Sequence, residues 1–597
     1  MHDDNQQASF ATILSLAEQL PIAAQSRLIA ALATQLAEAL ARRAPDTLAA
    51  GVGVTGATAT EPVHEHGIPA PLQFVHDSTA FPWIDLLPNG INAANGQPLL
   101  VIDAVGARAF AVKRSDDEEL QQLHQARANS DSEQLGLVHG RSYDQLHAAG
   151  WAIVVSVEDD AALLTALEPL IAHRCREQGL PVPVLTSDQG ETCGAWLARQ
   201  GADMQRPMGA EVALHLPILT YQPGESCSSW LARYNVSARP VDPARGVPFY
   251  LLLIGRPGPL SPADLAYIPF EFQYQLDLFW GVGRLCFTDD DGYHDLAAYT
   301  AYAEHVVAHE RQMRPKQRRI VYFAPEHDLD RATQASVREL VRPLAEGVAG
   351  QPSIAAQYGF QQELLLTTAA TRVNLAGVLG GGSTPCPDLF FAASHGVGFP
   401  STDPRLRTTQ GALVCQDWTG YGNITREHWF CAEDLAPTAD VRGLIAILFG
   451  CYSLGCPRDD QFTALTAPPC PIAPHTLVAR LPQMLLRQGA LAIFGHIDRA
   501  WTYSFRGNTQ GSARSAHAQT QAFEDLLARI MDGKRMGYAT DQFNAQQGAT
   551  AVELSECLLQ QLARPTDDKT DELSLLWAAH NDLRNYALLG DPAVRLL

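Results

Sequence analysis

Apolar runs of strand length alternate with segments of helical periodicity over most of the chain, the pattern of strands buried on both faces by helices. The predicted strands are Leu99–Ile102, Ala152–Val157, Pro181–Leu185, Phe249–Ile254, Arg319–Phe323, Leu364–Leu366, Asp388–Ala393, Gly443–Phe449 and Ala490–Phe494. The predicted helices between them are Ala161–Gln178, Tyr293–Arg311, Ala332–Val348, Thr371–Leu379 and Leu477–Gln488. The sequence therefore predicts an α/β protein with a mostly parallel sheet flanked by helices.

The same patterning predicts five regions. The spacing of apolar residues predicts a leading helix within residues 1–45, which we expect to be a packed helix rather than a docking or oligomerisation element. Residues 46–70 are rich in Gly and Pro and are typical of a linker. Residues 71–245 form an additional mixed α/β region with a βαβ unit and no recognisable catalytic pattern. Residues 246–350 and 351–597 form two α/β subdomains with regular strand–helix alternation.

Composition and charge exclude several classes of protein. The 597 residues are 46% hydrophobic and 18% charged, which is typical of a globular chain. A net charge of −22 argues against binding to nucleic acid or to anionic membranes. Eleven cysteines without a CxxC pair argue against a disulfide scaffold or a zinc ribbon. The start lacks a signal-peptide pattern and no run of 18 apolar residues occurs, so a cytoplasmic protein without a membrane span is expected.

Reactive side chains follow three of the predicted core strands, and one of the three strands runs into Gly495-His496-Ile497-Asp498. Another strand ends in Ser394-His395-Gly396, and the third ends in Gly450-Cys451. Carboxyl ends of parallel strands meet at one edge of a sheet, so the imidazole and the thiol are expected there together. A buried Cys after a strand is often only a core residue, but its conjunction with the His favours a catalytic dyad. The N–H groups of Gly396 and Cys451 could form an oxyanion hole.

Short motifs around these residues resemble the caspase-like (clan CD) cysteine peptidases, and the gingipain branch in particular. Ser394-His395-Gly396 and Gly450-Cys451 resemble the dyad of that clan. Three further segments, in the same order, are similar to gingipain segments: the opening strand at 250–255 with the proline turn at 267–269, the "IGRF"-type segment at 282–285, and the closing "GDP-x-x-R-L" segment at 586–596, which CHAT-type peptidases share.

The resemblance covers about 246–597 and implies a cysteine endopeptidase with His395 as the base, Cys451 as the nucleophile and no metal or organic cofactor. A protein or peptide would be its substrate. Residues 1–245 have no counterpart in the resemblance, and gingipains have a signal and a propeptide that this sequence does not show. Residues 1–245 are therefore a candidate region for a regulatory partner.

The resemblance also suggests a specificity pocket. Gingipains carry an acid just after the strand that precedes the His strand. Asp330 aligns best with that acid and Asp328 comes second, while Asp498 lies on the same edge and Trp501 could wall the pocket. An acid there predicts cleavage after Arg or Lys. The alternative is that Asp330 is only the N-cap of the following helix.

Rival interpretations use some of the same residues. A catalytically inactive caspase-like scaffold is the main alternative. A serine hydrolase with Ser453 as nucleophile is weaker, because the first Gly of a G-x-S-x-G elbow is Cys451 here. Cys451 with Cys456, Cys470 and His475 would make a poor zinc site because of its spacing. The glycine-rich segments lack the complete motifs of nucleotide-binding loops.

Overall fold

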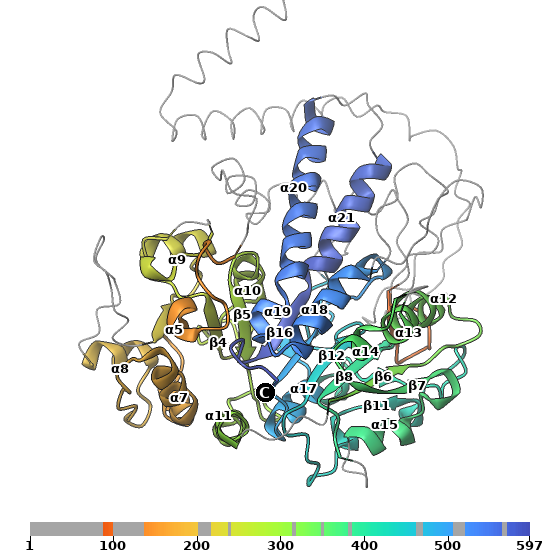
Figure 1. Ribbon diagram of the computed structural model, residues 1–597, viewed down its shortest axis with the longest axis horizontal. Helices are drawn as coiled ribbons and strands as arrows, with labels where there is room; N and C mark the ends of the chain where they lie inside the picture. Colours follow the sequence, from red (N-terminus) through yellow and green to blue (C-terminus); the bar gives the residue numbers. More distant parts are fainter. Residues whose placement is uncertain are drawn as a thin grey trace, which may run out of the picture. The chain divides into compact units, whose positions relative to one another are not determined.

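The computed structural model describes residues 88–99, 136–200, 217–236, 240–312, 318–347, 351–379, 385–460, 470–505, 520–563 and 570–596 (Figure 1). The predicted leading helix, the linker and residues 100–102 of one predicted strand lie outside these ranges. Of the helices within them, none combines the length and the apolar character needed to cross a membrane.

A ten-stranded, mostly parallel sheet flanked by helices forms the centre of the described chain, as the hydrophobic pattern predicts (Figure 1). Its strands are, in spatial order, β3 (Ile218–Tyr221), β2 (Trp151–Ser156), β4 (Tyr250–Ile254), β5 (Gly281–Leu285), β16 (Tyr586–Gly590), β15 (Ala492–His496), β12 (Ile445–Phe449), β8 (Leu389–Ala393), β6 (Arg319–Ala324) and β7 (Gln361–Leu366). The predicted regions 71–245, 246–350 and 351–597 all contribute strands to this one sheet. Strands buried on both faces explain why so many of these segments are continuously apolar.

The direction of the strands reverses once, between β15 and β16. β16 pairs antiparallel with β15 and parallel with β5. The carboxyl ends of β8, β12 and β15 therefore lie at one edge of the sheet, and those of β2, β4 and β5 at the opposite edge. The strand ends that carry His395 and Cys451 both belong to the first edge.

The closing segment forms the joint between the two halves. A Cβ on Gly283 of β5 would lie 2.2 Å from the carbonyl oxygen of Gly590, so the chains approach too closely for a side chain. The buried Asp591 carboxylate accepts hydrogen bonds from Trp151 Nε1 at 2.9 Å and from Arg174 Nε at 2.8 Å. The "GDP" segment thus ties three elements together and plays a structural role.

Most helices connect successive strands. The longer ones are α7 (Glu168–Gln178), α10 (Phe270–Asp277), α11 (Leu296–Gln312), α15 (Arg372–Leu379), α17 (Arg480–Arg487), α18 (Gln521–Met531), α20 (Asp541–Ala563) and α21 (Thr570–Arg584). The shorter ones are α5 (Leu146–Ala149), α6 (Ala162–Ala166), α8 (Cys193–Arg199), α9 (Cys227–Arg233), α12 (Arg331–Ala335), α13 (Arg342–Glu346), α14 (Ile354–Gln357), α16 (Leu406–Thr409) and α19 (Met536–Ala539). The α20 and α21 helices lie side by side (Figure 1).

Two predicted elements differ in the structure. The predicted strand 181–185 is wrong: the segment has no ladder partner, because Pro181 and Pro183 have no N–H to donate and Val184 is 74% exposed. The predicted helix 332–348 is divided into α12, a π-helical turn over Ser336–Val341, and α13.

A repeat, which the hydrophobic pattern alone did not reveal, lies before β4. The sequence at 184–199 returns 34 positions later at 218–233, with a Trp-Leu-Ala-Arg end in both copies. The contacts repeat as well: Trp196 Nε1 donates to the carbonyl of Thr186, and Trp230 Nε1 to that of Thr220, both at 2.8 Å. Of the two copies, the second supplies the ladder strand β3.

Two smaller groups of strands complete the sheet architecture of the described residues. β1 (Gly90–Asn92), β9 (Gly396–Gly398), β10 (Leu413–Val414) and β11 (Trp429–Phe430) form a four-stranded sheet, and β13 (Gly455–Cys456) pairs with β14 (Leu477–Val478). β9 begins directly after His395, and its parallel partner β1 comes from a segment much earlier in the chain. This pairing brings residues 88–92 to the edge where the thiol lies.

Candidate active site

Cys451 and His395 leave the sheet side by side. Their strands β12 and β8 are parallel neighbours, with Phe449 opposite Ala393, and Ser394 N donates to the carbonyl of Phe449 at 3.0 Å. A Cβ on Gly396 would lie 1.7 Å from the carbonyl oxygen of Cys451, so only glycine fits after His395. The two residues therefore meet at one edge, as the parallel arrangement predicts.

The two N–H groups that the sequence suggests for an oxyanion hole both bind one carbonyl group of the chain itself. The carbonyl oxygen of Asn89 accepts a hydrogen bond from Gly396 N at 2.9 Å and another from Cys451 N at 2.8 Å. Two convergent backbone donors are the arrangement that stabilises an oxyanion in acyl transfer. The predicted pair of N–H groups is thus present, and it holds the peptide bond that joins Asn89 to Gly90.

The Cys451 thiol lies against the same peptide. A Cβ placed on Gly90 would be 2.6 Å from Sγ, and Ala500 N donates to Sγ at 3.3 Å. Cys451 is fully buried. Burial raises the pKa of the thiol well above its ordinary value, so the sulfur is neutral while residues 88–92 cover it.

His395 is held by Asp330, which precedes α12. His395 Nε2 and Asp330 Oδ2 form a short hydrogen bond, while Nδ1 has no hydrogen-bond partner among the described residues. Burial acts to raise the pKa of Asp330, but the charge and hydrogen bond of His395 outweigh it and lower that pKa to about 2. Asp330 also caps α12 by accepting from Ala332 N at 3.1 Å. No hydrogen bond joins His395 directly to Cys451 in the described structure.

The other predicted pocket residues lie in different surroundings. Asp328 is exposed. Asp498 is buried, its Oδ1 accepts from Arg499 N at 2.8 Å, and burial raises its pKa. Trp501 forms an isolated antiparallel bridge with Pro88, so it lies beside residues 88–92, the segment that covers Cys451. The three acids therefore do not converge on one pocket for a basic side chain. Asp330 contacts His395, Asp328 faces solvent, and Asp498 contacts Arg499.

The side chain of Asn89 has a partner that the sequence did not suggest. It is fully buried, and its Nδ2 donates to Ser336 Oγ at 2.7 Å. Ser336 opens the π-helical turn after α12 and lies 247 positions away in sequence. An Asn-Gly pair is locally a turn signal, so no sequence pattern would have placed it in an active site.

A buried carboxylate organises the other wall of the site. Asp582 on α21 accepts from Trp501 N and from Ser504 N, both at 2.8 Å, and pairs with His496 at 3.1 Å. It thereby holds the loop that begins with Ala500, whose carbonyl accepts from Asn89 N at 2.8 Å. Asp582 is a positioning residue that sequence reasoning missed, because nothing near it in the sequence indicates this contact.

The rival nucleophile and the rival zinc set have structural contacts instead. Ser453 Oγ donates to the carbonyl of Leu448 at 2.9 Å, inside the turn after β12. Cys456 Sγ donates to the carbonyl of Pro457 at 3.3 Å. Among the described residues, the group that could offer three metal ligands is His173, Glu177 and Glu310, which has no residue in common with the rejected zinc set. Arg174 binds both oxygens of Glu310 at 2.8 Å, so a guanidinium already neutralises that group.

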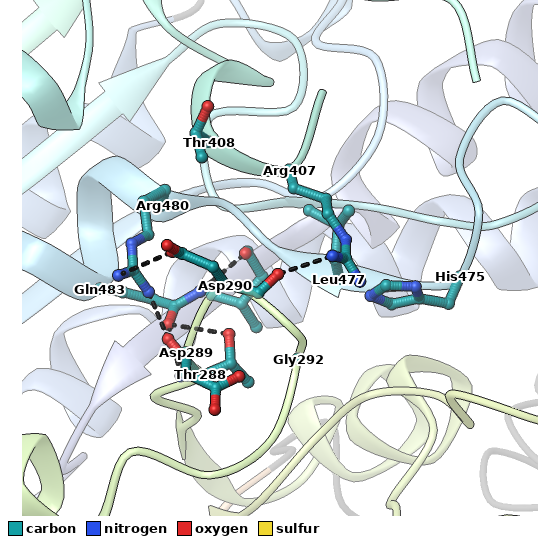
Figure 2. A pocket seen from close by; sticks show the side chains of 11 residues that line it. Thr288, Asp289, Asp290, Gly292, Arg407, Thr408, His475, Leu477, Arg480 and Gln483 are labelled. Atoms are coloured by element: carbon teal, nitrogen blue, oxygen red, sulfur yellow. Dashed lines mark hydrogen bonds and ion pairs between the residues drawn. The ribbon is translucent and has the colours of Figure 1, made fainter. Parts of the chain in front are cut away.

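Figure 2 shows a pocket that contains neither Cys451 nor His395. The loop at 288–292 lines it together with Arg407, His475, Arg480 and Gln483. Arg407 donates to the carbonyl of Asp290 at 2.6 Å, and Arg480 to that of Thr288. Its arginines thus hold a backbone loop.

Comparison with known proteins gives distant likenesses only. No family model and no curated protein sequence matches the chain. Similar solved structures include one described as "Structure of Protease", with a TM-score of 0.35 and 12% identity over 75% of this chain and 78% of that chain. Another is the Saccharomyces cerevisiae separase–securin complex, with a TM-score of 0.26 and 10% identity, in which 58% of this chain covers 15% of the other. These likenesses concern the fold alone.

Proposed function

We propose that this protein is a cysteine endopeptidase in which Cys451 is the nucleophile, His395 transfers the proton and Asp330 positions His395. One observation supports this most: two backbone N–H groups bind the carbonyl oxygen of Asn89, and the thiol lies beside the same peptide bond. A nucleophile, an oxyanion hole and an oriented base at one peptide are the parts that acyl transfer needs.

The reaction follows from these positions. The Cys451 sulfur attacks the carbonyl carbon, and the negative charge on the oxygen is stabilised by the N–H groups of Gly396 and Cys451. His395 carries the thiol proton to the leaving amine, and the carbon–nitrogen bond breaks to give a thioester. Water then hydrolyses the thioester and restores the thiol. Asp330 stabilises the positive charge that His395 gains during these steps.

The contacts of the acids argue against the predicted preference for Arg or Lys. Asp330, the acid expected to bind a basic side chain, is hydrogen-bonded to His395. Asp328 is exposed and Asp498 contacts Arg499. We therefore assign Asp330 to the orientation of His395. The specificity pocket is instead placed around the side chain of Asn89.

A catalytically inactive interaction protein is the second candidate, and the complete burial of Cys451 favours it. Gly90→Val separates the two candidates. A valine there would collide with Cys451 Sγ and with Leu99, so residues 88–92 can no longer cover the thiol. A latent enzyme becomes active in this variant, whereas an inactive scaffold stays inactive.

The test is cleavage of a casein-derived peptide mixture by the parent chain and by Gly90→Val, each with and without Cys451→Ala. We expect hydrolysis that requires Cys451, with the larger rate in Gly90→Val. Cys456→Ala is the matched control, because Cys456 is also fully buried and its thiol pKa is also raised by burial. A folded Gly90→Val protein that cleaves no peptide, or cleavage that survives Cys451→Ala, would overturn the proposal.

A further inference from the structure

We propose that residues 88–92 are bound as the enzyme's own substrate, that Cys451 cleaves the bond between Asn89 and Gly90, and that the enzyme selects asparagine before the cleaved bond. This inference rests on the proposed function and goes beyond it by naming a self-cleavage site and a substrate class. It starts from the way the segment is held on both sides of one peptide bond.

The residues before the bond pair with the loop after β15. Asn89 N donates to the carbonyl of Ala500 at 2.8 Å, and Pro88 forms an antiparallel bridge with Trp501. Addition of an extended segment to a strand edge is a common way of binding a peptide irrespective of its side chains. The backbone contacts therefore align the carbonyl of Asn89, and its side chain is left to supply specificity.

The residues after the bond are held separately. Gly90–Asn92 pairs in parallel with β9 from Gly396 to Gly398, and Ala93 N donates to the carbonyl of Gly398 at 2.8 Å. Leu99 N donates to the carbonyl of Gly90 at 3.0 Å, which closes a hairpin over residues 90–99. Two independent anchors thus hold the peptide bond at the thiol, and the anchor after the bond remains when the bond is broken.

The contact with Ser336 distinguishes asparagine from aspartate. The Ser336 hydroxyl donates its hydrogen to the carbonyl of Ala332 at 2.9 Å, so towards Asn89 it acts as an acceptor. The amide of asparagine supplies the matching N–H donor, whereas the carboxylate of aspartate has none. A buried carboxylate would face an oxygen lone pair without compensation, which is unfavourable. Asn89 Oδ1 has no partner among the described residues, so the contact with Ser336 fixes the side chain.

Glycine after the bond fits the approach of the thiol. A Cβ at Gly90 would be 2.6 Å from Cys451 Sγ and 2.4 Å from a methyl carbon of Leu99. Any side chain there pushes the peptide away from the nucleophile. Asparagine followed by glycine is therefore the pair that this closed arrangement accommodates.

The bonds made and broken balance. A sulfur–carbon bond forms at the Asn89 carbonyl, the carbon–nitrogen bond to Gly90 breaks, and the new amine takes the thiol proton through His395. One water then hydrolyses the thioester and leaves a carboxyl group on Asn89 and a free thiol on Cys451. Residues 1–89 are separated from residues 90–597, and the sites at Ala500 and Ser336 become available to other peptides.

The first experiment follows the mass of the full-length chain during incubation at several protein concentrations, with sequencing of any new amino terminus. We expect a fragment that begins at Gly90, at a rate independent of concentration because the segment and the thiol belong to one chain. The fragment should be absent in Cys451→Ala and present in Cys456→Ala. Deamidation of Asn89 would leave the chain unbroken, so its mass distinguishes it from cleavage.

The second experiment tests the selected residue. Asn89→Asp and Asn89→Arg should each slow self-cleavage at least about ten-fold, since each loses a buried hydrogen bond and gains an uncompensated charge. The full-length Gly90→Val chain is then given peptides that differ only before the cleaved bond. We expect Asn to outrank Asp, Gln and Arg, and Ser336→Ala to reduce the preference for Asn over Asp.

The outcomes separate this inference from the proposed function. Cys451-dependent cleavage of peptides without a fragment starting at Gly90 would overturn self-cleavage and leave the peptidase intact. A preference for Arg or Lys, or one for Asn that Ser336→Ala does not change, would overturn the assigned pocket. Absence of any Cys451-dependent cleavage in both experiments would overturn the proposed function itself.

Discussion

The replacement Asp330→Asn distinguishes a residue that positions His395 from one that binds a basic substrate. Asparagine caps a helix about as well as aspartate, so α12 should keep its first turn. The variant loses the negative charge beside His395. With a side chain only 10% exposed, Asp330 interacts with His395 largely out of reach of solvent.

The size of the effect follows from the pKa of Asp330. The difference between its ordinary value of 3.8 and about 2 corresponds to about 2 kcal/mol at roughly 1.4 kcal/mol per pKa unit. If this energy stabilises the charge that His395 gains in the transition state, its loss lowers kcat by about 30-fold. The relative preference among residues before the cleaved bond should not change.

The assay measures kcat and residue preference for peptides in the Gly90→Val background, with Asp328→Asn as the matched control because Asp328 is exposed. The control should change neither quantity. A selective loss of cleavage after Arg or Lys in Asp330→Asn, with kcat for other residues retained, would refute the positioning role and restore the basic pocket.

The effect of Asp330→Asn on stability depends on pH, in a direction that follows from the lowered pKa of Asp330. The folded state lowers the pKa of Asp330, so the ionised carboxylate contributes stability above its ordinary pKa of 3.8 and loses that contribution as the pH falls toward 2. The melting temperature of Asp330→Asn should therefore lie below that of the parent at pH 7. The gap should narrow below about pH 4. Both proteins carry Cys451→Ala, so that self-cleavage does not interfere.

Three further replacements test other parts of the site. Gly396→Ala should lower kcat by roughly 10²–10³-fold, the cost of losing one oxyanion donor, because a Cβ 1.7 Å from the carbonyl oxygen of Cys451 must displace the N–H of residue 396. A variant with the kcat of the parent would contradict the role of this N–H. Asp582→Asn should raise KM and lower the melting temperature, since it removes a buried charge that accepts from Trp501 N and Ser504 N; an unchanged KM would contradict its role. Ser453→Ala should keep cleavage and cost about 1–3 kcal/mol of stability on urea denaturation, as a buried hydrogen bond is lost; loss of cleavage in a folded variant would favour a serine nucleophile.

The sequence by itself determined most strands of the central sheet and the edge at which Cys451 and His395 lie, but it missed β3, β5 and β16. Continuous apolar runs of four to seven residues, such as 443–449, are a local signal of a doubly buried strand. Parallel neighbours share an edge, so the side chains after two such strands are brought together without knowledge of distant contacts. The pairing of the Gly396 and Cys451 N–H groups was suggested on the same local grounds.

Only the tertiary structure decided what surrounds these two residues. Asn89 lies 247 positions from Ser336 and Asp591 lies 417 positions from Arg174, and such pairings depend on which loops close over the sheet. Local periodicity does not contain that information. Asp330 shows the limit most clearly: its place before a helix was readable in the sequence, whereas its contact with His395 depends on where the folded chain places the start of α12 relative to the residues after β8. Side-chain partners at long sequence separation are set by the packed fold, and the function proposed here depends on those partners.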